Sequence, residues 1–349
     1  MSDQLVEDVA NYFLWTVMSP ILLTIGTMGN ILSIVVLTRR TSQTSVYLMA
    51  LSLADILVLN TGLLRQFIKR VSGIDVRLLS EPGCKMHVMT VYSSLHISVW
   101  ILVAFTCERI ISVFAPHKVR SYCTRLTSTA AVAGITCLLL ALNSHFVYGM
   151  GRGGNHTLIT CSELYPEYEN FLSFTWPWID FSVFCLVPCV VLLAGNTSIV
   201  LGVLASKRKS RRVGPILEAS AQPLPRNKTS SMTAVLLMLN LVFVLTTAPV
   251  SLFFILYPSW QERIRTEQDV ARANLVFAAV NLFQYLNNAL NFLLYCGSGT
   301  KFRQDLAGIF RRGQFVIHGR PTTITHGRPT TTMATSFIRT VRLGRSQVY

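Results

Sequence analysis

The sequence predicts an all-α membrane protein, a bundle of seven transmembrane helices followed by an amphipathic eighth helix. Of its 349 residues, 51% are hydrophobic and 13% are charged, whereas a soluble domain carries about 25% charged residues. The apolar residues form long runs instead of the alternating or one-sided patterns of soluble strands and helices. The basic residues behind the net charge of +15 gather in short connectors and in the tail. They therefore fit membrane topology better than nucleic-acid binding.

Seven apolar runs are long enough to cross a membrane as helices. They cover residues 12–37, 45–69, 86–114, 126–148, 174–205, 231–256 and 271–296. The sequence accordingly divides into an extracellular N-terminus at 1–11, the transmembrane bundle at 12–298, the amphipathic helix 8 at 299–312 and a disordered cytoplasmic tail at 313–349. Helix 8 alternates basic and apolar residues, so we expect it to lie on membrane lipid. The tail has too few apolar residues to form a core.

Charge on the connectors predicts the side of the membrane that each faces. Basic residues follow the first, third and fifth runs, as at Arg39, Lys118 and Lys207, while the opposite connectors are mixed or acidic. The positive-inside rule therefore predicts a multi-pass membrane protein with its N-terminus outside, and we expect it in the plasma membrane. Asn155 begins an Asn-His-Thr glycosylation sequon on the outer side, where a glycan can be added.

Asp55 is a carboxylate near the middle of the second run, where leaving it unpaired would be costly. The polar residues that could surround it are Asn30, Ser98, Asn287 and Asn291. These groups would either hold a sodium ion, because hard cations prefer oxygen ligands, or form a neutral or water-bridged hydrogen-bond network. No cofactor is expected beyond a structural sodium ion at Asp55.

The uninterrupted apolar stretch of the third run stops at Glu108 and Arg109, about 38 Å along a helix from Cys84. An arginine at such an end can simply reach the lipid headgroups. Alternatively, the adjacent charges form a pair that closes the inner ends of the helices and opens toward a cytoplasmic partner. We favour the pair, because polar residues recur at comparable places in the other runs.

Taken in order along the chain, these motifs resemble the class A, or rhodopsin-like, G-protein-coupled receptors. The residues that carry the resemblance are Gly29-Asn30, Leu51-Ser52-Leu53-Ala54-Asp55, Cys84, Glu108-Arg109-Ile110, Cys161, Pro188, Phe243, Pro249, Asn291-Phe292-Leu293-Leu294-Tyr295 and Phe302-Arg303. The resemblance implies a receptor, not an enzyme, that binds an extracellular ligand and activates heterotrimeric G proteins. It also implies a disulfide between Cys84 and Cys161, a G-protein switch at Glu108, Arg109 and Tyr295, and a tail that receptor kinases and arrestin bind.

Some positions depart from the pattern of that family. Thr247 replaces its tryptophan at the pocket floor, Phe292 replaces its proline in span seven, and Asn196 replaces its tyrosine in span five. The fourth run also lacks the family's tryptophan. We therefore expect the fold in full but the family's activation switches only in part.

The resemblance also narrows the ligand. Val91 stands where the family's amine receptors carry an acid, and the seventh run has no lysine for a retinal Schiff base. The outer halves of the runs instead offer charges of both signs and aromatic side chains. The predicted ligand-binding residues are Arg65, Gln66, Tyr92, His96, Asp180, Phe254, Tyr257, Phe277, Asn281, Gln284 and Tyr285.

A basic Arg65 and a separate acidic Asp180 suit a zwitterionic or amidated peptide, although Arg65 could also reach the outer headgroups and Asp180 could stay exposed. The segment Tyr47-Leu48-Met49-Ala50-Leu51-Ser52-Leu53-Ala54-Asp55 is similar to FMRFamide-receptor-like neuropeptide receptors. On that resemblance, Asp180 or Glu163 would bind a ligand arginine, and the polar cluster near Arg65 and Gln284 a terminal amide. A small anionic ligand, a nucleotide or a lipid, is the alternative. A transporter is more distant, because Asp55 is the only deep acid.

Overall fold

The structure is a computed structural model that describes residues 2–155, 158–212, 226–299 and 302–309. All described residues belong to one compact unit, Met1–Ile309. The second unit, Phe310–Tyr349, is not among the described residues. The predicted disordered tail at 313–349 is therefore outside the described residues.

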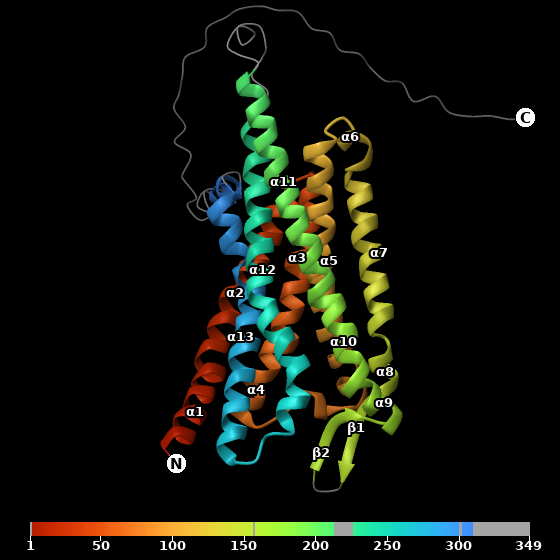
Figure 1. Ribbon diagram of the computed structural model, residues 1–349, viewed down its shortest axis with the longest axis vertical. Helices are drawn as coiled ribbons and strands as arrows, with labels where there is room; N and C mark the ends of the chain where they lie inside the picture. The colour runs from red at the N-terminus through yellow and green to blue at the C-terminus, as the bar shows by residue number, and fades with distance from the viewer. Residues whose placement is uncertain (1, 156–157, 213–225, 300–301, 310–349) are drawn as a thin grey trace, which may run out of the picture. The chain divides into compact units, whose positions relative to one another are not determined.

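The described chain runs up and down in long helical rods (Figure 1). The α-helices are α1 Ser2–Phe13, α2 Ser19–Thr38, α3 Gln43–Val58, α4 Leu64–Ser72, α5 Glu81–Phe114, α6 Val119–Tyr122, α7 Arg125–Asn143, α8 His145–Gly149, α9 Pro166–Asn170, α10 Trp176–Phe181, α11 Val187–Arg212, α12 Arg226–Gln261 and α13 Glu267–Ser298. Single π-helical segments continue α1 into α2, α3 into α4, α9 into α10 and α10 into α11, at Leu14–Met18, Leu59–Leu63, Phe171–Thr175 and Ser182–Leu186. A 3-10 turn, Val76–Leu79, precedes α5.

Six rods in the described part of the chain are long and apolar enough to cross a membrane. They are Gln4–Leu37, Gln43–Ser72, Glu81–Phe114, Arg125–Gly149, Pro166–Ser206 and Thr233–Gln261, and they coincide with the first six predicted runs. The seventh predicted run is also one continuous helix, α13, of 32 residues. It falls outside the apolar set because it carries a row of polar side chains. Those side chains are buried in the protein: Asn281, Gln284, Asn287, Asn288 and Asn291.

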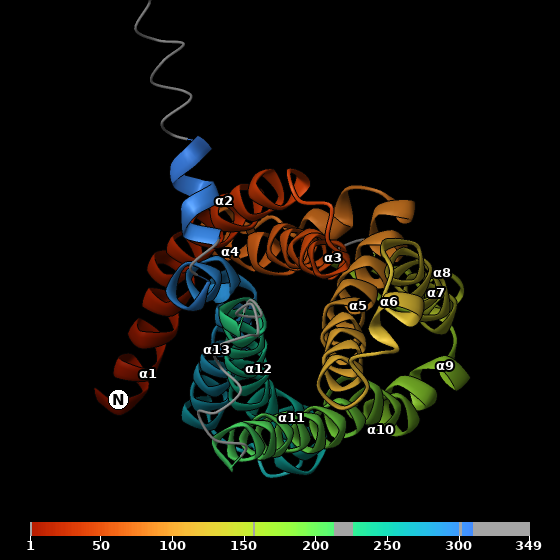
Figure 2. The ribbon, with the colours of Figure 1, turned by 90° about the horizontal axis from the view of Figure 1, so that it is seen from above.

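Viewed along their length, the rods stand in a ring (Figure 2). Neighbours in sequence pack side by side, as α2 does with α3 and α12 with α13, and α13 closes the ring against α2. α5 packs against α3, α7, α11 and α12. Side chains along α5 therefore face the interior of the bundle at both of its ends.

Close packing holds the rods together, since lipid is as apolar as the side chains between them. Leu51, Phe105, Leu192 and Leu236 are buried in one core that α3, α5, α11 and α12 share. Gly26 lets α2 approach α13 closely. A Cβ there would lie 2.5 Å from Leu59 Cδ1 and 3.0 Å from Ala289 Cα.

The first rod begins earlier than the sequence predicts. α1 is helical from Ser2, not from residue 12, because neither proline nor glycine interrupts this segment. One side of α1 is held against α13, where Asn11 is buried and Glu7 pairs with Arg272 at 3.3 Å. Much of the predicted N-terminal segment at 1–11 is therefore an extension of the first helix.

The predicted eighth helix is present over residues 302–309. Phe302 is buried, 5.6 Å from the ring of Tyr295, and Asp305 pairs with Arg40 at 2.7 Å. Residues 300, 301 and 310–312 of the predicted segment 299–312 are outside the described residues. Within the described part, the helix is tied to α13 and to the end of α2.

Candidate functional site

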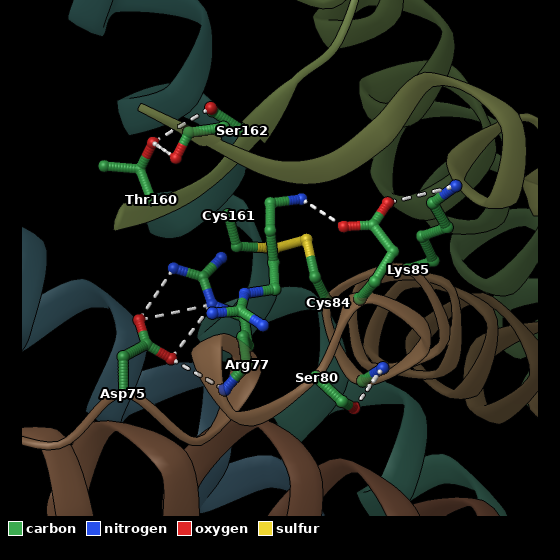
Figure 3. The surroundings of a disulfide bond; sticks show 12 residues. Asp75, Arg77, Ser80, Cys84, Lys85, Thr160, Cys161 and Ser162 are labelled. Carbon is green, nitrogen blue, oxygen red and sulfur yellow. Dashed lines mark hydrogen bonds and ion pairs between the residues drawn. A yellow bond between two sulfur atoms is a disulfide. The ribbon is translucent and has the colours of Figure 1, made fainter. Parts of the chain in front are cut away.

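One end of the bundle, here called the disulfide end, carries a covalent link between two distant parts of the chain. Ser80 caps α5 by accepting a hydrogen bond from Gly83 N at 3.0 Å, which places Cys84 in the first helical turn. Cys84 is bonded to Cys161 (Figure 3). The predicted disulfide partners are thus joined in the structure.

Cys161 lies in a hairpin of two antiparallel strands, β1 Met150–Asn155 and β2 Leu158–Glu163. Arg152, which pairs with Cys161 in register, donates its backbone N–H to the Glu81 carboxylate at 2.8 Å. The hairpin is therefore fixed to the start of α5 at two points. Asn155 is the last residue of β1, while His156 and Thr157 of its sequon are outside the described residues, so glycosylation stays a prediction.

A cavity of about 400 Å³ lies at the disulfide end, a size typical of small-ligand sites. The hairpin contributes Met150 and Glu163 to its wall. The rods α4, α5, α10, α12 and α13 contribute most of the predicted ligand-binding residues: Arg65, Gln66, Tyr92, Asp180, Phe254, Phe277, Asn281, Gln284 and Tyr285. Residues far apart in sequence therefore meet around one space.

His96 lies behind this wall, not on it. It is fully buried, with Nε2 2.9 Å from Asp180 Oδ1 and Nδ1 3.0 Å from Asn143 Nδ2. An amide nitrogen can only donate, so Nδ1 accepts and Nε2 carries the proton that it donates to Asp180. The structure corrects the predicted ligand contact: His96 orients the partly exposed acid that lines the cavity.

Tyr257 is the other predicted residue that does not line the cavity. Its ring lies 5.2 Å from that of Phe253, which in turn lies 5.9 Å from Phe277 on the cavity wall. Tyr257 lies one helical turn beyond Phe253 and packs against that ring, so it reaches the wall through Phe253. It supports the aromatic rim from outside.

Arg65 is held by a carboxylate that comes from a connector. Its Nε and Nη2 donate to Asp75 at 2.9 and 2.7 Å. Arg77 donates from Nη2 to the same carboxylate at 2.9 Å, and Figure 3 shows Asp75 and Arg77 facing each other beside the disulfide. Burial alone would raise the pKa of the Asp75 carboxyl. Its hydrogen bonds to Arg65 and Arg77, and their charges, instead hold that pKa well below its usual range.

Sequence reasoning missed several residues of the wall. Arg77 lies in a connector outside every apolar run, so no pattern within the runs pointed to it. Trp176 lines the cavity with its ring 5.9 Å from Tyr92. Its spacing of four residues from Asp180 puts both on one helical face, and that signal could have found it.

Asp55 is fully buried and accepts hydrogen bonds on both of its oxygens. Oδ1 accepts from Ser98 Oγ at 3.0 Å and from Asn288 Nδ2 at 2.7 Å, and Oδ2 accepts from Asn291. Asn288 takes the place predicted for Asn287, which makes no hydrogen bond to Asp55. The prediction was wrong by one position because a single residue step turns a side chain to another helix face.

The Asp55 network also offers oxygen atoms without partners. Asn30 donates to the Asn288 backbone oxygen at 2.9 Å. In the described part of the chain, Asn30 Oδ1 and Asn288 Oδ1 are buried and accept no hydrogen bond. Carboxylate and amide oxygens are the hard ligands that a sodium ion prefers, and the predicted ion stays a prediction.

At the opposite end, Glu108 and Arg109 form a buried ion pair. Arg109 Nη2 donates to Thr44 Oγ1 of α3 at 2.7 Å, and Ser128 Oγ of α7 donates to Glu108 Oε2 at 3.2 Å. Arg109 is thus turned inward, away from lipid headgroups, and the pair ties α5 to α3 and α7. Tyr295 is buried in the neighbouring core against Phe302.

The family model described as 7 transmembrane receptor (rhodopsin family) matches residues 29–295. This range contains the Asp55 network, the disulfide, the cavity residues and the Glu108–Arg109 pair.

Individual relatives are distant. Neuromedin-U receptor 1 of Rattus norvegicus is 25% identical over 308 residues, which cover 80% of this chain and 69% of the relative. Probable G-protein coupled receptor 142 of Mus musculus is 26% identical over 264 residues, or 74% and 62% of the two chains. C-C chemokine receptor type 1 of Homo sapiens is 24% identical over 301 residues, or 82% and 77%. The chain thus spans less than two thirds of the length of the mouse protein.

Proposed function

The chain belongs to the rhodopsin family of seven-transmembrane receptors, and we propose that it is a receptor for an extracellular peptide. Members of this family are membrane receptors that couple ligand binding to G proteins, and they are not enzymes. The observation that carries the proposal is the cavity, which is lined by side chains of opposite charge, Asp180 of α10 and Arg65 of α4. A peptide, with cationic and anionic or polar groups along one chain, suits such an arrangement.

The similarity to neuropeptide receptors supports a peptide ligand. Neuromedin-U receptor 1 is among the relatives, and a chemokine receptor is another. The narrower likeness to FMRFamide-receptor-like proteins stays a prediction. In this proposal Asp180, oriented by His96, binds a cationic group such as a ligand arginine. Whether the group near Arg65 is an amide or a carboxylate depends on the net charge around that arginine.

We place the disulfide end outside the cell. Disulfides persist in the oxidising exterior, and the basic connectors lie at the Glu108–Arg109 end. The N-terminus would then be extracellular, and the Glu108–Arg109 pair would face the cytoplasm. At the cytoplasmic face the pair would release when a heterotrimeric G protein binds. Receptor kinases and arrestin would act on the tail. A sodium ion at Asp55, inside the bundle, would stabilise the inactive state.

The test is second-messenger output, calcium and cyclic AMP, in cells that express the protein and are challenged with a peptide panel. We expect one peptide family to give a response that Asp180→Ala and Arg109→Ala abolish at equal surface expression. No response to any peptide from a well-expressed receptor would contradict the proposal.

The second candidate is a small anionic ligand, such as a nucleotide or lipid, and the clustering of Arg65 with Arg77 favours it. Such a ligand has no cationic group for Asp180. Its response would be lost in Arg65→Ala but kept in Asp180→Ala, so the same pair of variants separates the two candidates.

A further inference from the structure

The wall around Arg65 carries more positive than negative charge. Arg65 and Arg77 both donate to the one carboxylate of Asp75, at 2.7 and 2.9 Å from their Nη2 atoms. Two guanidinium groups sharing a single carboxylate leave one positive charge without a counter-ion. We call these three residues the basic wall.

Other charged groups nearby do not cancel this surplus. Lys69, 4.0 Å from Asp75, would only add positive charge, and at 53% exposure it is screened by water. Glu163 lines the cavity from β2, but it is exposed and, among the described residues, forms no ion pair with either arginine. Asp180 belongs to another rod and is hydrogen-bonded to His96.

The two arginines still have donors to offer. The hydrogen bonds to Asp75 use only Nε and Nη2 of each guanidinium. Within the part of the chain that the structure describes, neither Nη1 atom has a hydrogen-bond partner. Both side chains line the cavity, while Asp75 does not. Both guanidinium side chains, unlike Asp75, therefore border the cavity, where their unused donors can meet a ligand.

The basic wall is also held in a fixed geometry. Asp75 Oδ1 caps the Val76–Leu79 turn by accepting from Arg77 N at 3.2 Å, and this turn leads directly into Ser80 and the disulfide. Figure 3 shows Arg77 next to the Cys84–Cys161 bond. Donors that are already in place lose little conformational freedom when a ligand binds.

We propose that Arg65 and Arg77 together bind a carboxylate of the ligand, its C-terminal group, with Asp75 as the residue that positions both guanidiniums. This inference rests on the proposed function of the protein as a peptide receptor. A carboxylate supplies the missing counter-ion and accepts from both arginines at once. A terminal amide would leave the positive charge uncompensated in a partly desolvated cavity. The structure thus favours a free acid where the sequence suggested an amide.

The experiment compares three forms of each active peptide: the free acid, the C-terminal amide, and the free acid with any internal Asp or Glu neutralised. Potency is measured on the wild-type receptor and on Arg77→Gln, with surface expression monitored through an epitope tag. We expect the free acid to be the more potent form and Arg77→Gln to lower its potency roughly ten- to a hundredfold, as for a lost charge-assisted hydrogen bond. The potency of the amide should hardly change in Arg77→Gln, which also shows that the variant is folded.

Two further variants sharpen the result. Arg70→Gln removes an exposed arginine of α4, the helix of Arg65, and should change nothing, because Arg70 lies over Tyr12 at 5.4 Å and outside the cavity. Arg77→Lys keeps the charge but loses the forked donors, so an intermediate loss is expected.

The outcomes are distinguishable. In one outcome, neutralising an internal acid lowers potency, amidation does not, and Arg77→Gln makes the neutralised and unmodified peptides equally potent. The carboxylate then comes from a ligand side chain, and the basic wall keeps its role. If no carboxylate matters, or if the amide is the more potent form, the inference is wrong while the receptor remains a peptide receptor. If no peptide in any form gives a response, the proposed function itself fails.

Discussion

Asp180 is a cavity acid whose orientation depends on residues that a ligand never reaches. His96 donates to it, and Asn143 of α7 fixes the tautomer of His96 from the other side. A carboxylate held in one direction loses less entropy on binding a cation than a freely rotating one. Ligand affinity should therefore respond to changes in a buried histidine.

We predict that His96→Phe, which keeps a ring but removes the donor, lowers the potency of a cationic peptide about tenfold, the effect of one lost hydrogen bond. The maximal response should stay unchanged, because the switch at the other end is untouched. Concentration–response curves measure this directly. Ser144→Ala, an exposed hydroxyl next to Asn143, is the matched control, and equal potency of His96→Phe and wild type would disprove the positioning role.

Asp75 gives a prediction about pH. A carboxyl whose pKa is lower in the folded state stabilises the fold at pH values above its unfolded pKa, about 3.9. That stability is lost as pH falls through the lowered folded pKa. Because the arginines hold the pKa of Asp75 well below its usual range, the basic wall should stay ionised throughout pH 5–8.

We therefore expect Asp75→Asn to destabilise the purified receptor by on the order of 2 kcal/mol at every pH from 5 to 8, somewhat less than for a fully buried pair. Thermal unfolding of both proteins across this range is the measurement. A difference that vanishes between pH 6 and pH 5 would show that the carboxyl titrates above its ordinary range, and that the arginines do not hold it ionised.

Among the elements, α5 carries the contacts that would hold the bundle closed if the Glu108–Arg109 pair acts as the proposed switch. Near one end it bears Tyr92 on the cavity wall, and at the other Glu108 and Arg109, bonded to Ser128 and Thr44. In the proposed switch, the two hydroxyls would stabilise the closed arrangement, because they tie α5 to α7 and α3. Their removal should shift the equilibrium toward the open state.

Each hydrogen bond of this kind contributes about 1 kcal/mol, or about fivefold in a two-state equilibrium. We predict that Ser128→Ala or Thr44→Ala raises basal G-protein signalling two- to fivefold, and that the double variant raises it further. Cyclic AMP and calcium without ligand are the readouts. Ser112→Ala, which removes a hydroxyl bonded to the Glu108 backbone one turn away, should leave basal output unchanged. Lower basal output in Ser128→Ala would mean that the pair supports the active state instead.

For the molecule as a whole, the disulfide joins the β1–β2 hairpin to the same region that holds the basic wall. Without it, the hairpin would keep its hydrogen bond to Glu81 but lose its covalent attachment to α5. Removing a native disulfide of this kind typically destabilises a small domain by about 2–5 kcal/mol.

We predict that Cys84→Ser and Cys161→Ser each reduce surface expression and ligand response strongly, and to the same extent. The double variant should be no worse than either single one, because all three lack the same bond. Flow cytometry of tagged receptors provides the comparison. An additive loss in the double variant would indicate separate roles for the two cysteines.

Long apolar runs made the rods predictable, because a helix satisfies the backbone hydrogen bonds of a lipid-spanning segment within that segment. The Asp55 network was predictable in outline, since a deep carboxylate demands partners, but Asn288 was missed because a run of polar residues does not reveal its helical phase. Asp75 and Arg77 could not be found this way. Connectors have no periodicity, and only the folded turn brings their charges to Arg65. The role of His96 likewise depends on a contact with α7 that no local pattern encodes.

The polar row of α13 bears on how the receptor is made. A helix with several buried amides partitions poorly into lipid on its own, since each polar side chain carries an insertion penalty at the membrane centre. Asn288 and Asn291 find their partner in Asp55 of α3, which has been synthesised long before. α13 should therefore enter the lipid only when the earlier rods are already assembled beside it. Membrane insertion of α13 and completion of the bundle then occur in one step.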